Sequence, residues 1–222
     1  MMDAVLKKIG EIRLVPVVKI EDSRNAVRLG QALKEGNLPI AEIPYRTEAA
    51  EEAIRILTAE LPEILVGAGT VLTLDQVKSA VGAGARFIVA PGYNPKVVDY
   101  CIEHNIIIIP GVNNPSQIER ALENRLKVVK FFPAEASGGL PFLKAVAAPY
   151  SGIQFLPTGG INLQNIMSYL SFSRVIACGG SWMVKSDLIS RGNFKDIKRL
   201  SQEAAAAIKE NSGYAGKTNS GR

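Results

Sequence analysis

Short runs of apolar, largely β-branched residues recur at regular intervals along the chain, and an amphipathic stretch follows each run. Short segments that are apolar throughout are typical of strands buried on both faces of a parallel sheet. The apolar runs predict strands at Leu14–Lys19, Pro39–Pro44, Ile64–Ala68, Phe87–Ala90, Ile106–Pro110, Val128–Phe132, Ile153–Pro157 and Val175–Cys178. The amphipathic stretches predict helices at Ser23–Glu35, Glu48–Glu60, Leu74–Ala83, Pro95–His104, Pro115–Glu123, Leu140–Ala148, Leu163–Ser171 and Asn193–Lys209.

This alternation of strands and helices predicts an α/β protein, a (β/α)8 TIM barrel formed by a single domain. A doubly wound open sheet is the alternative, and it is disfavoured because an open sheet leaves two edges to protect. A short N-terminal helix at Asp3–Gly10 is placed to close the barrel floor. We expect residues 1–210 to form the domain and the polar residues 211–222 to be a disordered tail.

The charge distribution limits the classes of partner. The net charge is +5, but residues 191–222 hold most of it, so the body of the chain is nearly neutral. A neutral body without a basic, aromatic-rich stripe argues against a nucleic-acid partner. No apolar run approaches the length of a membrane span, and the N-terminus lacks the apolar core of a signal peptide. We expect a cytoplasmic protein that acts on a small molecule.

The metal-binding residue types are sparse. Cys101 and Cys178 are far apart in apolar segments, so we expect buried, reduced thiols. His104 is the only histidine in the sequence, and no loop is rich in carboxylates. We therefore expect no metal site, and we expect the protein to need no cofactor.

Lys130 lies in the apolar run Val128–Phe132, where a charged side chain is costly. Desolvation disfavours the charged form of an amine, and a neutral amine can attack a ketone to form a Schiff base. The alternative is a lysine at a strand end whose side chain reaches solvent. The adjoining Phe131-Phe132-Pro133 favours the chemical interpretation.

A second charged residue is predicted inside the barrel. Alternation along the second strand puts Glu42, Pro44 and Arg46 on one face, and a buried glutamate is costly without a role. Alternate strands of a TIM barrel supply the same interior layer, so Glu42 on strand two and Lys130 on strand six are expected to face each other. A structural ion pair between Glu42 and Arg46 is the alternative.

Glycines mark the C-terminal ends of three strands. Gly67 and Gly69 precede Thr70, where they are expected to let a ligand approach the backbone. Gly159-Gly160 and Gly179-Gly180 follow strands seven and eight, the recurrent phosphate site of these barrels, although tight turns would also explain either pair. An amine, an acid–base group, a guanidinium and a phosphate site together suit a phosphorylated keto acid.

The segments Val66–Leu72, Lys130–Glu135, Pro157–Ile161 and Gly179–Trp182 resemble the class I 2-keto-3-deoxy-6-phosphogluconate (KDPG) aldolases. These enzymes are also called 2-keto-4-hydroxyglutarate (KHG) aldolases. The resemblance implies a homotrimeric TIM-barrel lyase that cleaves KDPG to pyruvate and glyceraldehyde 3-phosphate in the Entner–Doudoroff pathway. It also implies cleavage of 4-hydroxy-2-oxoglutarate to pyruvate and glyoxylate.

The resemblance assigns roles to individual residues. Lys130 is the imine-forming lysine and Glu42 the general acid/base. The substrate-binding residues that it implies are Arg46, Thr70, Pro91, Phe132 and Thr158. The phosphate-binding residues that it implies are Gly159, Gly160, Gly180 and Ser181.

Three other functions remain open at this stage. The chain differs from the commonest family sequence at Tyr45, Asn113-Asn114 and Ser137. These differences leave the distal half of the substrate undetermined. An aldolase for the galactonate analogue is one alternative, although Arg46 favours the gluconate. A phosphosugar isomerase or lyase that uses Glu42 without an imine is the second. A non-catalytic barrel that binds a phosphometabolite is the third.

Overall fold

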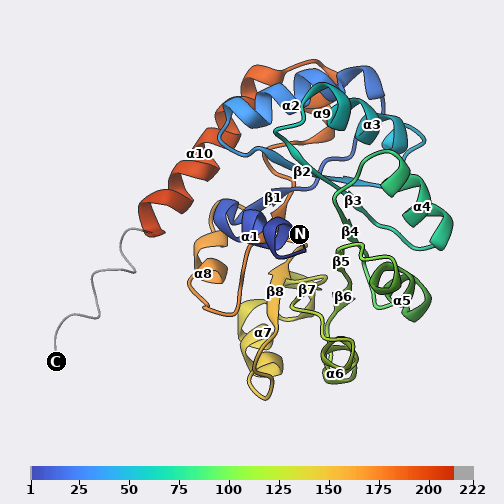
Figure 1. Cartoon of the computed structure of the whole chain (residues 1–222). Helices are drawn as coiled ribbons and strands as arrows, with labels where there is room; N and C mark the ends of the chain where they lie inside the picture. Colours follow the sequence, from blue (N-terminus) through green and yellow to red (C-terminus); the bar gives the residue numbers. More distant parts are fainter. Residues whose placement is uncertain (1, 213–222) are drawn as a thin grey trace.

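Parallel pairing joins each strand of the computed structural model, which describes residues 2–212, to the next strand around a closed ring (Figure 1). Bridges at Val17–Glu42 and Thr158–Gly179 continue the ring between the regular ladders. Pairing of Leu14 with Cys178 closes it. The strands are β1 (Leu14–Pro16), β2 (Ile40–Pro44), β3 (Leu65–Gly69), β4 (Phe87–Val89), β5 (Ile108–Ile109), β6 (Gly111–Val112), β7 (Val128–Phe131), β8 (Gln154–Pro157) and β9 (Cys178–Gly180).

Two of these segments are halves of one barrel strand. Pro110 separates β5 from β6, because proline has no N–H with which to continue a ladder. β5 pairs with β4 and β6 pairs with β7, and the Pro110 carbonyl accepts a hydrogen bond from the Lys130 N–H at 2.9 Å. The barrel therefore has eight strands, and the predicted (β/α)8 fold is confirmed.

Helices cover the outside of the barrel (Figure 1). Asn94 and Asn114 cap two of them by accepting backbone N–H groups, and a proline follows each at the first helical position. The helices are α1 (Met2–Ile12), α2 (Ala26–Glu35), α3 (Ala50–Glu60), α4 (Leu74–Gly82), α5 (Pro95–Glu103), α6 (Pro115–Glu123), α7 (Gly139–Ala147), α8 (Ile166–Leu170), α9 (Ser186–Ser190) and α10 (Phe194–Ser212). Short 3-10 turns lie at Ser23–Asn25 and Glu135–Ser137. No helix of the described residues is long and apolar enough to cross a membrane.

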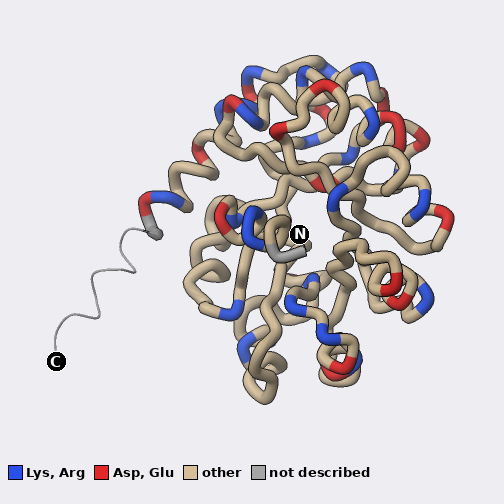
Figure 2. Tube along the Cα trace, viewed as in Figure 1, with Lys and Arg blue, Asp and Glu red and all other residues tan. Residues whose placement is uncertain are grey.

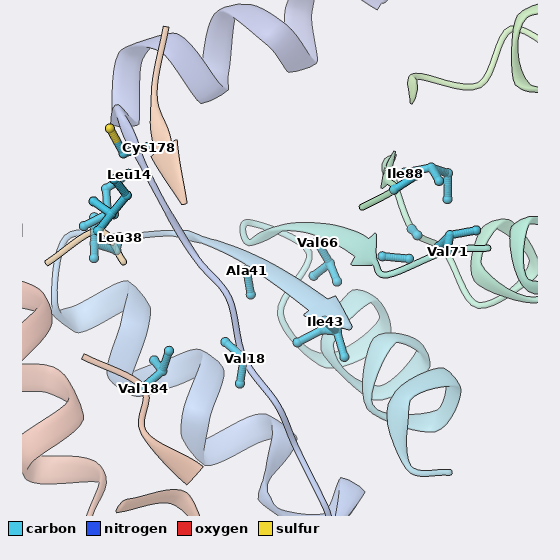
Figure 3. Close-up of a cluster of buried hydrophobic side chains, with 14 of the residues drawn as sticks. Leu14, Val18, Leu38, Ala41, Ile43, Val66, Val71, Ile88, Cys178 and Val184 are labelled. Atoms are coloured by element: carbon cyan, nitrogen blue, oxygen red, sulfur yellow. The ribbon is translucent and has the colours of Figure 1, made fainter. Parts of the chain in front are cut away.

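Alternation along the strands divides the apolar side chains into two cores. Ala41 and Ile43 of β2 pack outward with the helices in the larger core, part of which Figure 3 shows. Ile40 points inward, where it shares a smaller core with Phe87 of β4. Val5 of α1 belongs to this inner core, so the N-terminal helix closes the barrel floor as expected.

The outer surface carries mixed charge. Basic and acidic residues are interspersed along the helices (Figure 2). Arg55 pairs with Glu51 in α3 and Arg199 pairs with Glu203 in α10, each one helical turn apart. Exposed pairs of this kind contribute little, so the two apolar cores supply most of the stability.

Several predicted elements have different bounds in the structure. β1 ends at Pro16 rather than Lys19, and β5 begins at Ile108 rather than Ile106. Ser23–Asn25 forms a 3-10 turn ahead of α2 rather than its first turn. The eighth strand is Cys178–Gly180 instead of Val175–Cys178, because its glycines pair with β1 despite their low strand propensity. α8 begins at Ile166 rather than Leu163, because the Asn162 side chain accepts from the following N–H groups and forms a turn.

The remaining differences are small. α9 (Ser186–Ser190), between the eighth strand and the last helix, was not predicted. The predicted tail, residues 211–222, lies outside the described residues from residue 213 onward, while Asn211 and Ser212 continue α10.

Both cysteines are buried in the larger core, and burial raises the pKa of the Cys101 thiol to about 12 and also raises the pKa of Cys178. The thiolate is the reactive form, so at pH 8 a thiol of pKa 12 is ionised in roughly one molecule in ten thousand. We expect neither thiol to react with Ellman's reagent in the native protein. Two thiols per chain should react in 6 M guanidinium, and fast native labelling would contradict the packing.

Candidate active site

Two charged side chains meet inside the barrel. Lys130 on β7 and Glu42 on β2 are 3% and 1% exposed, and the lysine Nζ lies 3.4 Å from Glu42 Oε1. The expectation that these residues face each other is confirmed. The alternative ion pair between Glu42 and Arg46 is wrong, because Glu42 pairs with the lysine. Lys130 Nζ also lies 5.2 Å from the centre of the Phe132 ring.

Polar atoms beside this pair have no partner. Glu42 Oε2 and Thr158 Oγ1 are buried and accept or donate no hydrogen bond within the described part of the chain. A buried polar atom without a partner costs about 1–3 kcal/mol, so it is rare unless a ligand or water completes it. Glu42 Oε2 and Thr158 Oγ1 are therefore available to polar groups of a bound molecule.

Small residues create the room for these side chains. A Cβ at Gly69 would overlap the carboxylate of Glu42, and a Cβ at Gly179 would overlap the hydroxyl of Thr158. Gly67 makes room for the ring of Phe87 in the same way. The prediction that Gly67 and Gly69 let a ligand approach the backbone is wrong, since side chains of the chain itself fill that space.

Arg46 and Thr70 are joined at the mouth of the barrel. Arg46 Nε donates a hydrogen bond to Thr70 Oγ1 at 3.0 Å, and the guanidinium is exposed. Thr70 has φ 51°, a left-handed conformation that is unusual for a β-branched residue. It follows Gly69, which packs on the Glu42 side chain, so this strained turn begins next to the buried carboxylate.

A pocket of about 150 Å³ opens at this mouth, and it gathers most of the predicted substrate-binding residues. Its lining is Val17, Arg46, Phe132, Thr158, Gly159, Gly160, Ile161, Gly179, Gly180 and Ser181. Lys130 and Glu42 do not line it, but Lys130 lies beneath the Phe132 ring. Thr70 does not line the pocket either, but its hydroxyl accepts a hydrogen bond from Arg46, which does.

The loop after β8 supplies backbone donors to this pocket. Gly159 and Gly160 have φ values of +100° and +82°, which favour glycine. Their carbonyls accept hydrogen bonds from the Glu135 N–H and from the side chain of Asn165. The N–H groups of Gly160 and Ile161 donate to no acceptor in the described chain, so they are available to an anion.

The second glycine pair does not form the tight turn that was the alternative to a phosphate site. Gly179 and Gly180 form the end of β9 and have no positive φ. A Cβ at Gly180 would overlap the ring of Trp182, so close packing requires this glycine rather than a turn. Ser181 follows on the rim but does not cap α9, which begins five residues later.

Pro91 is placed apart from the other predicted residues. It lines a neighbouring hollow with Leu72 and Tyr93 and does not line the pocket at the barrel mouth. Its assigned role stays a prediction. Conversely, Val17 and Ile161 line the pocket but were not predicted, since an apolar residue at a strand end carries no chemical signal.

A buried lysine and carboxylate beneath a mouth with free backbone N–H donors define an α/β barrel suited to carbonyl chemistry. The family model for KDPG and KHG aldolases matches residues 4–200 of this chain. The chain is 47% identical over 205 residues to a 2-dehydro-3-deoxy-phosphogluconate aldolase of Haemophilus influenzae, covering 92% of this chain and 97% of the relative. It is 39% identical to the KHG/KDPG aldolase of Escherichia coli, covering 88% and 92%.

Solved structures agree with this similarity. A KDPG aldolase of Legionella pneumophila, with pyruvate captured as a covalent carbinolamine, matches with a TM-score of 0.87 at 35% identity, covering 92% of this chain and 98% of that one. A Zymomonas mobilis KDPG aldolase with 3-phosphoglycerate matches with a TM-score of 0.84 at 36% identity, covering 92% and 95%. The chain belongs to the KDPG and KHG aldolase family, and hence to the aldolases among the lyases.

Removing one member of the buried pair should destabilise the barrel. Lys130→Met leaves the Glu42 carboxylate without its cation, so we expect the free energy of unfolding in urea to fall by about 3 kcal/mol at pH 7. In the double variant Lys130→Met, Glu42→Gln no buried charge remains, and much of the loss should be recovered. Equal stability of the wild type and Lys130→Met would mean that water compensates the carboxylate.

Proposed function

We propose that the protein is a Schiff-base aldolase that reversibly cleaves KDPG to pyruvate and glyceraldehyde 3-phosphate. The observation that carries the proposal is the buried pair of Lys130 and Glu42, whose second carboxylate oxygen has no partner. The amine can form the imine, and the carboxylate can move the protons. Membership of the aldolase family supports the same reaction.

Imine formation is the first half of the reaction. The neutral amine of Lys130 attacks the C2 ketone of the substrate and gives a carbinolamine. Glu42 lies 3.4 Å from that amine, close enough to donate the proton with which the C2 hydroxyl leaves as water. The product is a protonated imine between C2 and Nζ, and its positive charge draws electrons from the adjoining bonds.

Cleavage follows from this electron demand. When the C4 hydroxyl loses its proton, C4 and its oxygen become the carbonyl of an aldehyde. The electrons of the C3–C4 bond move into the imine. Glyceraldehyde 3-phosphate leaves, and the remaining three carbons form an enamine on Lys130. Protonation at C3 and addition of water release pyruvate and restore the amine.

The two ends of the substrate match different groups of the pocket at the mouth. We assign the carboxylate at C1 to Arg46 and Thr70, with Phe132 and Thr158 beside the reacting carbons and Pro91 in the outer wall. A guanidinium is suited to carboxylate recognition. We assign the phosphate to the backbone of Gly159, Gly160 and Gly180 with the hydroxyl of Ser181. Supporting this, the Gly160 and Ile161 N–H groups have no acceptor in the described chain.

We further propose that 4-hydroxy-2-oxoglutarate is a second substrate, cleaved to pyruvate and glyoxylate. Its keto-acid half is the same as that of KDPG, and its distal half is smaller. The Escherichia coli relative is named for both activities. Family membership also supports a homotrimer and a place in the Entner–Doudoroff pathway. The cytoplasmic location expected from the sequence stays a prediction, as does the absence of a metal.

Pyruvate and borohydride test the imine directly. Reduction should trap a covalent adduct, and peptide mass mapping should place it on Lys130. The Lys130→Met variant should form no adduct and should lose aldol cleavage. As a control, Lys127→Met removes an exposed lysine three residues away and should be trapped like the wild type. An adduct on another lysine would contradict the assignment. Cleavage of KDPG with no adduct at all would favour a mechanism without an imine.

Glu42→Gln tests the proton carrier. The amide keeps the size of the side chain and a hydrogen-bond acceptor but cannot transfer a proton, so kcat for KDPG should fall about 100-fold or more. KM should change much less, because the groups assigned to the carboxylate and phosphate are untouched. Turnover close to the wild type across the pH range would mean that water or another group carries the protons.

A further inference from the structure

In two peptide groups of the loop after β8, the carbonyl accepts a hydrogen bond but the N–H donates none within the described residues. The Gly159 carbonyl accepts from the Glu135 N–H at 3.0 Å, and the Gly160 carbonyl accepts from Asn165 Nδ2 at 3.0 Å. In a trans peptide the N–H points away from the carbonyl of the same group. The N–H groups of Gly160 and Ile161 therefore point away from these anchors. Both residues line the pocket at the mouth.

The side chain of Glu135 lies against this loop. A Cβ at Gly160 would lie 2.5 Å from Glu135 Cγ and 2.6 Å from Glu135 Cβ, so the stem of the glutamate packs directly on the glycine Cα. Glu135 also belongs to the segment that follows Lys130. Its backbone N–H and its side chain thus both hold the loop, from the 3-10 turn that follows β7, the strand of the buried lysine.

Tyr169 fixes the far end of that glutamate. The tyrosine lies on α8 and is 1% exposed, and its hydroxyl donates a hydrogen bond to Glu135 Oε1. Burial, and then this hydrogen bond, raises the pKa of Tyr169, so the hydroxyl keeps its proton and remains a donor. Glu135 itself is exposed, so no core packing holds its carboxylate in place.

Two glycines border the side chain of Glu135. Gly139 has φ +66°, and a Cβ there would lie 3.3 Å from Glu135 Oε1 and 3.6 Å from the Tyr169 hydroxyl. The positive φ of Gly139 and Gly160 requires glycine at both positions, and Gly160 in addition leaves the space that the stem of Glu135 fills.

We propose that Glu135 and Tyr169 are positioning residues that hold the Gly159–Ile161 loop with its N–H groups turned toward the substrate phosphate. The inference rests on the proposed function, in which this loop binds the phosphate. Neither residue touches the reacting carbons. Their loss should weaken recognition of the phosphate and leave the imine chemistry intact.

Steady-state kinetics on two substrates test the inference. Tyr169→Phe removes only the hydroxyl, and Glu135→Ala removes the acceptor and the stem. Each should raise KM for KDPG about 3- to 10-fold, the loss expected for one hydrogen bond. KM for 4-hydroxy-2-oxoglutarate, which has no phosphate, should stay unchanged. Glu135→Gln keeps an acceptor for Tyr169 and should retain the wild-type KM for KDPG.

Tyr150→Phe is the matched control. Tyr150 also donates to a glutamate, at 3.0 Å from Glu119, but it precedes β8 at the other end of the barrel. This variant should leave both KM values unchanged. Equal changes on both substrates in Tyr169→Phe, or no change on either, would overturn the positioning role. An effect of Tyr150→Phe as large as that of Tyr169→Phe would also overturn it.

Binding of inorganic phosphate separates this inference from the proposed function. Phosphate added to the wild type should shift the NMR signals of the Gly160 and Ile161 amides, and Tyr169→Phe should bind it about 3- to 10-fold more weakly. Wild-type binding with unchanged affinity in Tyr169→Phe would refute the positioning role while leaving the aldolase proposal standing. Absence of aldol cleavage with intact phosphate effects would refute only the proposed reaction.

Discussion

The buried pair of Lys130 and Glu42 is the constraint around which the barrel is built. Two ionisable side chains that are nearly inaccessible to solvent lose several kcal/mol of hydration each, and one contact at 3.4 Å restores only part of it. The apolar cores on both sides of the strands offset this cost. The cost is understandable in the proposed reaction, in which the amine and the free carboxylate oxygen both act on a substrate carbonyl.

The side chains inside the barrel form a lower apolar layer and an upper polar layer. Phe87 and Ile40 fill the lower layer against α1, while the upper layer holds the charged pair and Thr158. Glycines on neighbouring strands leave room for three of these side chains: Gly67 for Phe87, Gly69 for Glu42 and Gly179 for Thr158. Close packing thus fixes the carboxylate of Glu42 without a hydrogen bond to its second oxygen. That oxygen remains free for chemistry.

The sequence predicted the chemical centre better than the rim, and the reason is physical. Glu42 and Lys130 could be placed because strand alternation and the order of strands determine which side chains share a barrel layer. The roles of Gly69 and Gly180 could not be read in this way, because they depend on side chains from distant or irregular segments. The boundary of β9 was missed for a related reason: pairing with β1 overrides the low strand propensity of its glycines.

The two ends of the site are held by different forces. Lys130 and Glu42 lie on strands, so the apolar cores fix their positions and any change there affects the whole fold. The loop at Gly159-Gly160 lies outside the strands and is held by a few hydrogen bonds from Glu135 and Asn165. Those bonds can change without loss of core packing. Substrate range at the distal end can therefore vary independently of the imine chemistry, and this separation suits a family whose members are named for both phosphorylated and unphosphorylated keto acids.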